Sequence, residues 1–225
     1  KNTIDPEDMI LNFGADAVRL FVLSDSPPER DIQWSDKGMN AAYKFVNKLW
    51  LLHQVVLKKI KNQNNQNAVD TTSAKINSFV AKITKSLENF NFNVIIANYY
   101  EIYNFLIKEI NNLNNEKNLK QNYEKVLLML LPVLPHFSSQ CLEDLGISGQ
   151  FNWPYFDENY KNYEKIKIVV QINGKKRSII ETDDEISEEK LLNLISSDDS
   201  IKKKLQDKKI KKSIYVKNRL INLII

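Results

Sequence analysis

The sequence predicts a mainly α-helical protein that ends in a small α+β domain, and three observations support this. Apolar residues recur every three or four positions through most of residues 5–145, which is typical of amphipathic helices. After Trp153 the period becomes two, which is typical of strands. Asn173-Gly174 then separates two alternating runs and is a strong hairpin signal. We therefore predict an antiparallel helical bundle followed by a compact domain with the order β-hairpin, helix, β-hairpin.

The helices of the bundle follow from capping residues and periodicity. Asp5 precedes Pro6 and can accept from the free N–H groups of a first helix, which Gly14 ends. The paired prolines Pro27-Pro28 end a second helix because they remove donors and disfavour helical geometry before them. We expect helices at about residues 5–13, 16–24, 35–60, 72–87, 93–113, 116–131 and 135–145.

The last third of the chain contains the strand signals. We expect strands at residues 165–172, 175–182, 211–216 and 219–225, with Lys217-Asn218 as the second turn. Ser187 can cap a helix over residues 187–196, and a second short helix is expected at residues 198–205. The domain boundaries that follow are 1–34, 35–156 and 165–225.

Composition excludes several classes of protein. The 43% hydrophobic and 27% charged fractions are ordinary for a globular chain, and no apolar run approaches the roughly 18 residues of a membrane span. The single cysteine, Cys141, excludes an intramolecular disulfide and a cysteine-based zinc cluster, which suits a reducing cytoplasm. We expect Cys141 to fill a helix interior and expect no metal site.

Catalytic motifs are also missing from the sequence. The two histidines, His53 and His136, each lie on a predicted helix among apolar neighbours, so we expect both to be buried or half-buried. The five glycines never form a phosphate-binding loop. We therefore expect no catalytic residues in this chain.

The charge is divided unevenly along the chain, which favours binding of a polyanion. Residues 1–159 have a net charge of −2 and residues 160–225 a net charge of +6, and residues 200–219 alone hold nine basic residues and one acid. Lysine suits phosphate contacts, and aromatic residues are sparse here, so a folded RNA fits better than a single strand. The candidate contacts are Lys175, Lys176, Arg177, Lys202, Lys203, Lys204, Lys211, Lys212, Lys217 and Arg219.

Several segments resemble one known family. They are NTIDPEDMILNFGADAVRLFVLSDSPPERDIQW, which continues to NKLW, then LLPVLPHFSSQCLEDLG, and the strand pairs VVQINGKKRSIIE and KKSIYVKNRLINLII. Together they are similar to the part of bacterial leucyl-tRNA synthetases, which are class I aminoacyl-tRNA synthetases, that follows the KMSKS signature. The resemblance covers essentially the whole chain.

The resemblance implies that this chain and the rest of the enzyme have different roles. The parent enzyme attaches leucine to its tRNA using ATP and Mg, and its HIGH and KMSKS motifs and editing domain are not found in this sequence. KMSKS would lie just before Lys1, so the chain would be a C-terminal fragment that is inactive alone and binds no cofactor. Residues 1–34 would end the catalytic domain, 35–156 would form the helical anticodon-binding-type domain, and 165–225 would bind the tRNA elbow.

The resemblance also implies partners and further contacts. Lys44, Asn47 and Lys48 on the long helix would join the basic residues above in contacting tRNA. The expected partners are leucine isoacceptor tRNAs and the rest of the synthetase chain, with no DNA and no membrane. We expect a cytoplasmic monomer.

Two alternatives remain open at this point. The chain could come from an isoleucine- or valine-type class I synthetase, although such enzymes normally bring a cysteine-rich zinc module or a C-terminal coiled coil, and neither is found in the sequence. It could also be a free-standing RNA- or protein-interaction module. HIGH and KMSKS motifs upstream in the same reading frame would decide for a synthetase.

Overall fold

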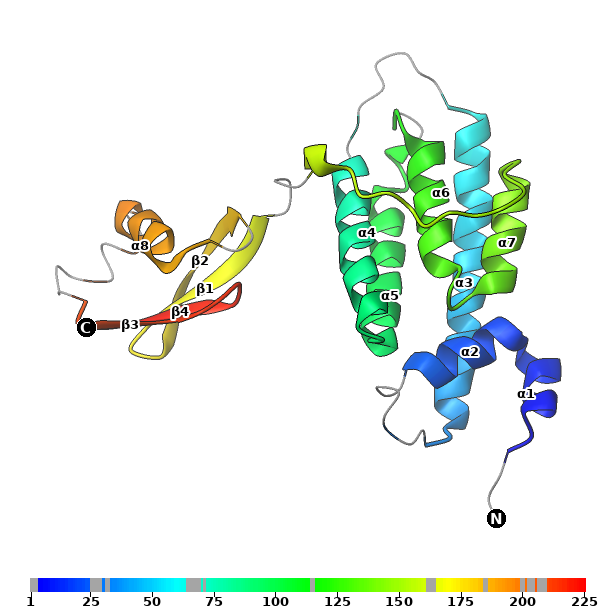
Figure 1. Cartoon of the computed structure of the whole chain (residues 1–225), viewed down its shortest axis with the longest axis horizontal. Coiled ribbons are helices and arrows are strands. Elements are labelled where there is room, and N and C mark those ends of the chain that lie inside the picture. The colour runs from blue at the N-terminus through cyan, green and yellow to red at the C-terminus, as the bar shows by residue number, and fades with distance from the viewer. Residues whose placement is uncertain are drawn as a thin grey trace. The chain divides into compact units, whose positions relative to one another are not determined.

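The computed structural model of the chain contains two compact units, residues 1–158 and residues 159–225 (Figure 1). It describes residues 4–24, 30, 33–63, 70, 72–113, 116–160, 165–183, 186–198, 201, 205 and 210–225. The first unit is helical, and the second is a small sheet with a helix on one face. Each unit has a hydrophobic core of its own, so we describe them separately.

Helices in the first unit follow the predicted order. They are α1 (Pro6–Phe13), α2 (Ala15–Ser24), α3 (Asp36–Lys61), α4 (Ser73–Glu88), α5 (Phe92–Glu109), α6 (Leu119–Leu130) and α7 (Pro135–Asp144). The expected boundary between the fifth and sixth helices is wrong, because α5 ends at Glu109 and α6 begins only at Leu119. The intervening segment is rich in asparagine, whose side chain competes for backbone hydrogen bonds and favours turns.

The first three helices begin and end where the sequence signals predict. Asp5 accepts a hydrogen bond from the Glu7 backbone N–H at 2.9 Å, and Gly14 ends α1 with a φ of 82°, which a side chain would disfavour. The Ser35 hydroxyl accepts from the Gly38 N–H at 3.2 Å at the start of α3. These local caps set where α1 and α3 start and the point at which the chain turns into α2.

A buried carboxylate joins α2 to the start of α7. Asp16 accepts from the Phe137 backbone N–H at 2.6 Å, from the His136 N–H at 3.4 Å and from the His136 ring at 2.9 Å. Asp16 thus caps a helix that lies 120 positions away in sequence and compensates the positive end of its dipole.

Arg19 makes the complementary contact one turn further along α2. Its guanidinium donates to the carbonyl oxygens of Pro132 at 2.8 Å and Val133 at 3.0 Å, in the turn that follows α6. Those carbonyls lie beyond the end of α6, where backbone acceptors lack helical partners. One helix therefore holds both sides of the α6–α7 corner, and we call Asp16 and Arg19 the corner clamp.

The α2–α3 contact is tight enough to require glycine. A Cβ built on Gly38 would lie 2.8 Å from the Phe21 ring, which is itself buried and packs edge-on against Trp34 at 5.2 Å between centroids. The core continues from this contact through α3, α4, α5 and α6. Its largest fully buried side chains include Tyr99, Phe79, Leu20, Met39, Ile76, Ile83 and Leu127.

Four strands form the sheet of the second unit, in the order β2-β1-β4-β3. They are β1 (Lys165–Ile172), β2 (Lys175–Asp183), β3 (Lys212–Val216) and β4 (Leu220–Ile224). The two predicted hairpins are present, but the sequence did not predict that β1 and β4 pair in parallel, with Val169 opposite Leu220. The two hairpins therefore form one continuous sheet.

The helix α8 (Glu188–Ser197) covers one face of this sheet. Leu191 and Ile195 pack into the core of the unit. The Ser187 hydroxyl accepts from the Lys190 N–H at 3.4 Å, so the predicted cap is present. The second expected helix, at residues 198–205, falls mostly outside the described residues.

Removal of the corner clamp carboxylate should destabilise the bundle. Asp16→Ala leaves two backbone N–H groups of α7 without their buried acceptor, and we expect a loss of about 3 kcal/mol in the free energy of unfolding. Urea titration followed by tryptophan fluorescence measures this unit alone, because Trp34, Trp50 and Trp153 all lie in it. The control is Asp5→Ala, which removes an exposed cap and should cost less than about 1 kcal/mol; equal losses would contradict the role of Asp16.

Gly38→Ala should destabilise the protein although alanine is the better helix former. The added methyl group meets the buried Phe21 ring, and overpacking of this kind outweighs a gain of up to about 1 kcal/mol in helix propensity. We expect a net loss of about 1 kcal/mol in the same urea titration. A stabilised variant would show that the contact between α2 and α3 adjusts freely.

Candidate nucleic-acid interface

Among the predicted contacts that the structure describes in the second unit, the basic residues lie at two ends of the sheet. Lys175 and Lys176 start β2 directly after the turn at Asn173-Gly174, whose φ angles of 48° and 76° are positive, as in the tight turns that asparagine and glycine favour. Lys211 and Lys212 lie at that same end. Lys212 pairs with Ile224, which comes directly after Leu223, and Leu223 lies opposite Ile172 at the end of β1. We call Lys175, Lys176, Arg177, Lys211 and Lys212 the cationic end of the sheet.

Backbone and amide contacts fix the cationic end. The Asn222 side chain accepts from the Gly174 N–H at 2.9 Å, and the Asn173 side chain accepts from the Ile225 N–H at 3.2 Å. The Lys211 N–H donates to the Ile224 carbonyl at 2.8 Å. The turn of the first hairpin is thus tied to the end of β4, and the lysines on β2 and β3 flank it.

Arg177 is displaced by a bulge. Ser178 lies opposite Val170 and Lys176 lies opposite Gln171, so Arg177 is the extra residue on β2. A bulge of this kind redirects a side chain relative to the regular alternation of a strand. Three strand spacings separate β2 from β3, so the lysines at the two edges stand on the order of 14 Å apart.

Other predicted contacts do not join this cluster. Lys217 and Arg219 flank the turn between β3 and β4, at the opposite end of the sheet, where Val216 pairs with Leu220. Lys202, Lys203 and Lys204 lie outside the described residues. Residues 200–219 form one basic segment in the sequence, but the β3–β4 hairpin places Lys211 and Lys212 at one end of the sheet and Lys217 and Arg219 at the other.

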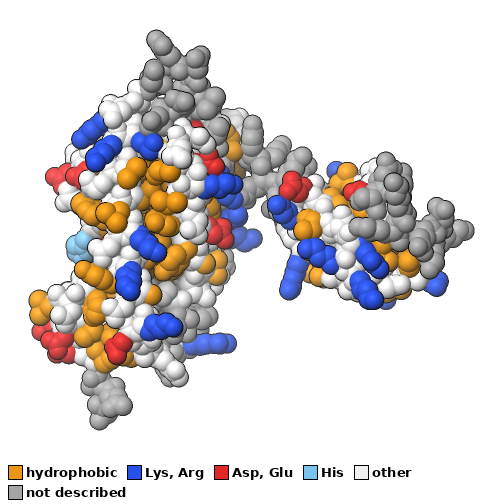
Figure 2. Space-filling model, turned by 180° about the vertical axis from the view of Figure 1, so that it is seen from behind, with side chains coloured by type: hydrophobic (Ala, Val, Ile, Leu, Met, Phe, Trp, Pro, Cys, Tyr) orange, Lys and Arg blue, Asp and Glu red, His pale blue; other side chains and the backbone are white. Residues whose placement is uncertain are grey.

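The three residues predicted on the long helix separate into two environments. Lys44 and Lys48 are exposed on the side of α3 opposite its core, in line with Leu51 and Val55, whose side chains are 66% and 40% exposed. Figure 2 shows hydrophobic side chains gathered on the rear of the first unit, with Lys and Arg side chains among them. Asn47 instead turns toward a pocket, and its amide donates to the Tyr43 carbonyl at 3.0 Å.

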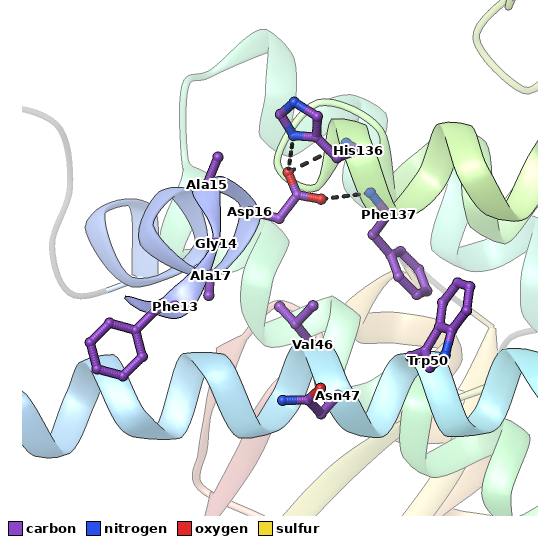
Figure 3. A pocket seen from close by; sticks show the side chains of 10 residues that line it. All are labelled: Phe13, Gly14, Ala15, Asp16, Ala17, Val46, Asn47, Trp50, His136 and Phe137. Carbon is purple, nitrogen blue, oxygen red and sulfur yellow. Dashed lines mark hydrogen bonds and ion pairs between the residues drawn. The ribbon is translucent and has the colours of Figure 1, made fainter. Parts of the chain in front are cut away.

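That pocket of about 370 Å³ joins three distant segments, as Figure 3 shows. Residues 13–17 come from the α1–α2 turn, Val46, Asn47 and Trp50 from α3, and His136 and Phe137 from α7. All three segments contain residues of the motifs found in the sequence, but the sequence does not show that they lie together. Contacts between positions this far apart leave no periodic signal in a single sequence.

The two histidines differ, and the expectation for one of them is wrong. The side chain of His136 is 76% exposed, because it lies in the first turn of α7 and points outward while its ring bonds to Asp16. His53 is fully buried as expected, with one ring nitrogen 3.2 Å from the Tyr123 hydroxyl and the other 3.1 Å from Asp144. Burial lowers the pKa of His53 from 6.5, although the nearby Asp144 opposes this shift.

Two further buried groups near His53 are held in their neutral forms. Burial raises the pKa of the Tyr123 phenol well above 10, and it raises the pKa of the Cys141 thiol in the same way. Cys141 is buried as expected and is not activated as a nucleophile. The cluster thus ties α3, α6 and α7 together and has no features of a reactive site.

The described part of the chain contains no group of three His, Cys, Asp or Glu side chains placed to hold a metal ion. None of the helices described there is long and apolar enough to cross a membrane.

Comparison with known proteins identifies the family. The family described as the anticodon-binding domain of tRNA ligase matches residues 71–212. The chain belongs to this family. The match begins just before α4 and reaches the first residue of β3, so it covers parts of both units of this anticodon-binding domain protein.

Relatives of this family member include bacterial leucine–tRNA ligases. The chain is 34% identical over 238 residues to the enzyme of Thermotoga maritima and 33% identical over 237 residues to that of Bartonella tribocorum. In both cases the whole chain is matched, but it spans only 29% and 27% of the relative, in its C-terminal part.

A solved structure shows the same fold. It is the ternary complex of Agrobacterium radiobacter K84 leucyl-tRNA synthetase (LeuRS) with tRNA and LeuAMS, to which the chain is 26% identical with a TM-score of 0.77. The similarity covers 99% of this chain and 30% of that one. The mainly helical fold with a small sheet is therefore that of the corresponding part of a leucyl-tRNA synthetase.

Acidification should weaken the bundle through His53. The folded state holds this histidine neutral, whereas the unfolded chain takes up a proton near pH 6.5, so stability is complete above that pH and is lost as the pH falls below it. We expect a loss of at most about 2 kcal/mol between pH 7.5 and pH 5.0, measured by urea titration of tryptophan fluorescence. His53→Gln does not titrate and should lose less over the same range; an equal loss in both proteins would assign the pH dependence to other groups.

Proposed function

We propose that this chain is the tRNA-docking part of a leucine–tRNA ligase. The observation that carries the proposal is the similarity of the whole chain to leucine–tRNA ligases, together with its fold similarity to a LeuRS structure that contains tRNA. The matched relatives favour the leucine enzyme over an isoleucine- or valine-type synthetase and over a free-standing module.

The cationic end of the sheet supplies a physical reason for RNA binding. Its lysines are exposed on both edges of the sheet, and their ammonium groups suit phosphate contacts that position an RNA without reading its sequence. Lys217 and Arg219 at the other end, and Lys202, Lys203 and Lys204, are proposed as additional contacts. By resemblance to the family, this domain would hold the tRNA elbow.

The first unit contributes a less charged surface. Lys44 and Lys48 lie beside the exposed Leu51 and Val55 on α3, and such a mixed surface suits ribose and phosphate contacts along the body of a tRNA. Asn47 is proposed to contact tRNA from the rim of the pocket, where its amide oxygen remains able to accept a hydrogen bond.

Catalysis is assigned to the rest of the enzyme. Leucine activation with ATP and Mg, and transfer of leucine to the tRNA, would take place in parts of the ligase outside this chain, which alone would be inactive and bind no cofactor. The partners are leucine isoacceptor tRNAs and the rest of the synthetase chain. A monomeric, cytoplasmic protein fits this proposal.

Binding to tRNA is measured by a gel shift across a salt series. We expect the chain to bind leucine tRNA more tightly than an unstructured RNA of equal charge, with affinity falling as salt rises because counterions are released. Equal affinity for the two RNAs at every salt concentration would reject docking to a folded tRNA.

A triple substitution tests the cationic end. Lys175→Ala, Lys176→Ala and Lys212→Ala together should weaken tRNA binding and reduce the slope of log K against log salt by roughly 0.7–0.9 for each phosphate that is no longer neutralised. The matched control is Lys85→Ala, Lys108→Ala and Lys120→Ala, which removes the same charge from exposed positions on α4, α5 and α6. An equal reduction of the slope in both proteins would show that only net charge matters.

A further inference from the structure

The pocket of the first unit has the size and the lining of a ligand site. It lies along α3 and has a volume of about 370 Å³. Figure 3 shows Phe13 at one end of it and Trp50 at the other, with Val46 and Asn47 of α3 between them. Small-molecule sites in proteins have volumes of roughly 300–1,000 Å³, so this pocket has room for a ligand at the small end of that range.

Both end walls are aromatic rings that other rings hold in place. Phe13 packs edge-on against Tyr43 at 5.8 Å between centroids, and Tyr43 lies two helical turns, or about 10.5 Å, before Trp50. Trp50 packs edge-on against Phe137 at 6.4 Å and lies 5.6 Å from the His53 ring, yet it remains 39% exposed. Because the indole is already oriented, less entropy is lost when a flat ring stacks on it.

Between these walls the lining is largely uncharged and offers one free amide. Asn47 donates one N–H to the Tyr43 carbonyl at 3.0 Å, so its oxygen and its second N–H remain available as an acceptor beside a donor. Asp16 is the one acid among the ten lining residues, and it already accepts from His136 and Phe137 at the positive end of α7. Such a lining suits an uncharged ring with polar edges better than it suits a phosphate.

A cation lies beside the pocket, outside its lining. Lys44 is exposed and precedes Asn47 by three residues, so the two side chains are neighbours on the surface of α3. Its ammonium group is placed to contact a phosphate next to a ring that enters the pocket. A nucleotide has this distribution of charge, with an uncharged flat base and an anionic phosphate. Bases inside a double helix are stacked and paired, so only a base from a loop or bulge can enter.

We propose that this pocket binds one unpaired nucleobase of the RNA that the chain docks. The inference rests on the function proposed above and names the feature of the RNA that the first unit recognises. Trp50 stacks on the base, Asn47 bonds to its edge, and Lys44 contacts the adjoining phosphate. Because every base has a π-face, the pocket accepts different bases. It therefore distinguishes an RNA with loops from a fully paired RNA.

The first experiment measures the accessibility of Trp50. In a protein that carries Trp34→Phe and Trp153→Phe, Trp50 is the remaining tryptophan, and acrylamide quenches its fluorescence through the exposed part of the indole. We expect leucine tRNA to protect Trp50 from acrylamide, because a stacked base covers that part. A blunt RNA duplex with the same number of phosphates should bind without protecting it. Equal protection by both RNAs would contradict the entry of a base.

The second experiment fills the pocket. Val46 lines it midway between Phe13 and Trp50, so Val46→Phe takes up the space of a base. We expect affinity for leucine tRNA to fall at least about fivefold, as on loss of one stacked base. The slope of log K against log salt should change by less than the roughly 0.7–0.9 of one phosphate. The matched control is Val94→Phe, at an exposed position on α5 outside the pocket, which should bind like the parent.

A second variant keeps the test decisive if Val46→Phe does not fold. Asn47 is exposed, so Asn47→Leu should leave the urea transition unchanged while it removes the amide, and it too should weaken binding without a change of slope. Affinity equal to that of the parent in each folded variant would overturn the proposal. So would protection of Trp50 by free adenosine with none by tRNA, which would assign the pocket to a small nucleoside.

The outcomes separate this inference from the proposed function. If the parent protein binds leucine tRNA and Trp50 stays accessible to acrylamide, the pocket proposal alone is wrong. If it binds leucine tRNA no better than an unstructured RNA, docking to a folded tRNA is wrong, and protection by the unstructured RNA still shows whether a base enters. If it binds no RNA, both proposals are wrong.

Discussion

The arrangement of the bundle depends on one buried carboxylate. Asp16 lies on α2, near the start of the chain, and accepts from the first N–H groups of α7, near the end of the helical unit. Arg19 holds the carbonyls just before that helix. The start of α7 needs hydrogen-bond acceptors and the carbonyls after α6 need donors. Side chains of α2 supply both. The pocket and the exposed His136 ring both take their positions from this contact.

Local signals predicted the helices and strands well because they depend on neighbouring residues. The periodicity of α3, the cap at Asp5 and the turn at Asn173-Gly174 each depend on at most a few adjacent positions. The wrong boundary between α5 and α6 missed such a local signal, the asparagine-rich segment, whereas the expectation for His136 failed because no local signal marks its exposure. His136 was expected to be buried because its neighbours are apolar, yet its place in the first turn of α7 exposes it to Asp16 and to solvent.

The candidate site shows the same limit more clearly. Charge counting along the chain identified the lysines of the second unit but could not tell which lie together. Lys175 and Lys212 come together only because Ile172 and Leu223 are partners in a parallel pair, a contact of long sequence separation. The resemblance grouped Asn47 with Lys44 and Lys48 on α3, and the roughly 100° rotation per residue of a helix turns Asn47 toward a different surface from the two lysines.

The central position of β4 also bears on how the second unit folds. The pairing of Val169 with Leu220 closes a loop that contains β2, α8 and β3, so it depends on residues made long after β1. Local hairpins form within microseconds. A parallel pair between strands far apart in the sequence forms more slowly, because closing the long loop between them costs conformational entropy. We therefore expect the docking of one hairpin onto the other to be the slow step in the folding of this unit. Until that step, β1 presents an unpaired edge, and unpaired strand edges are open to misassociation.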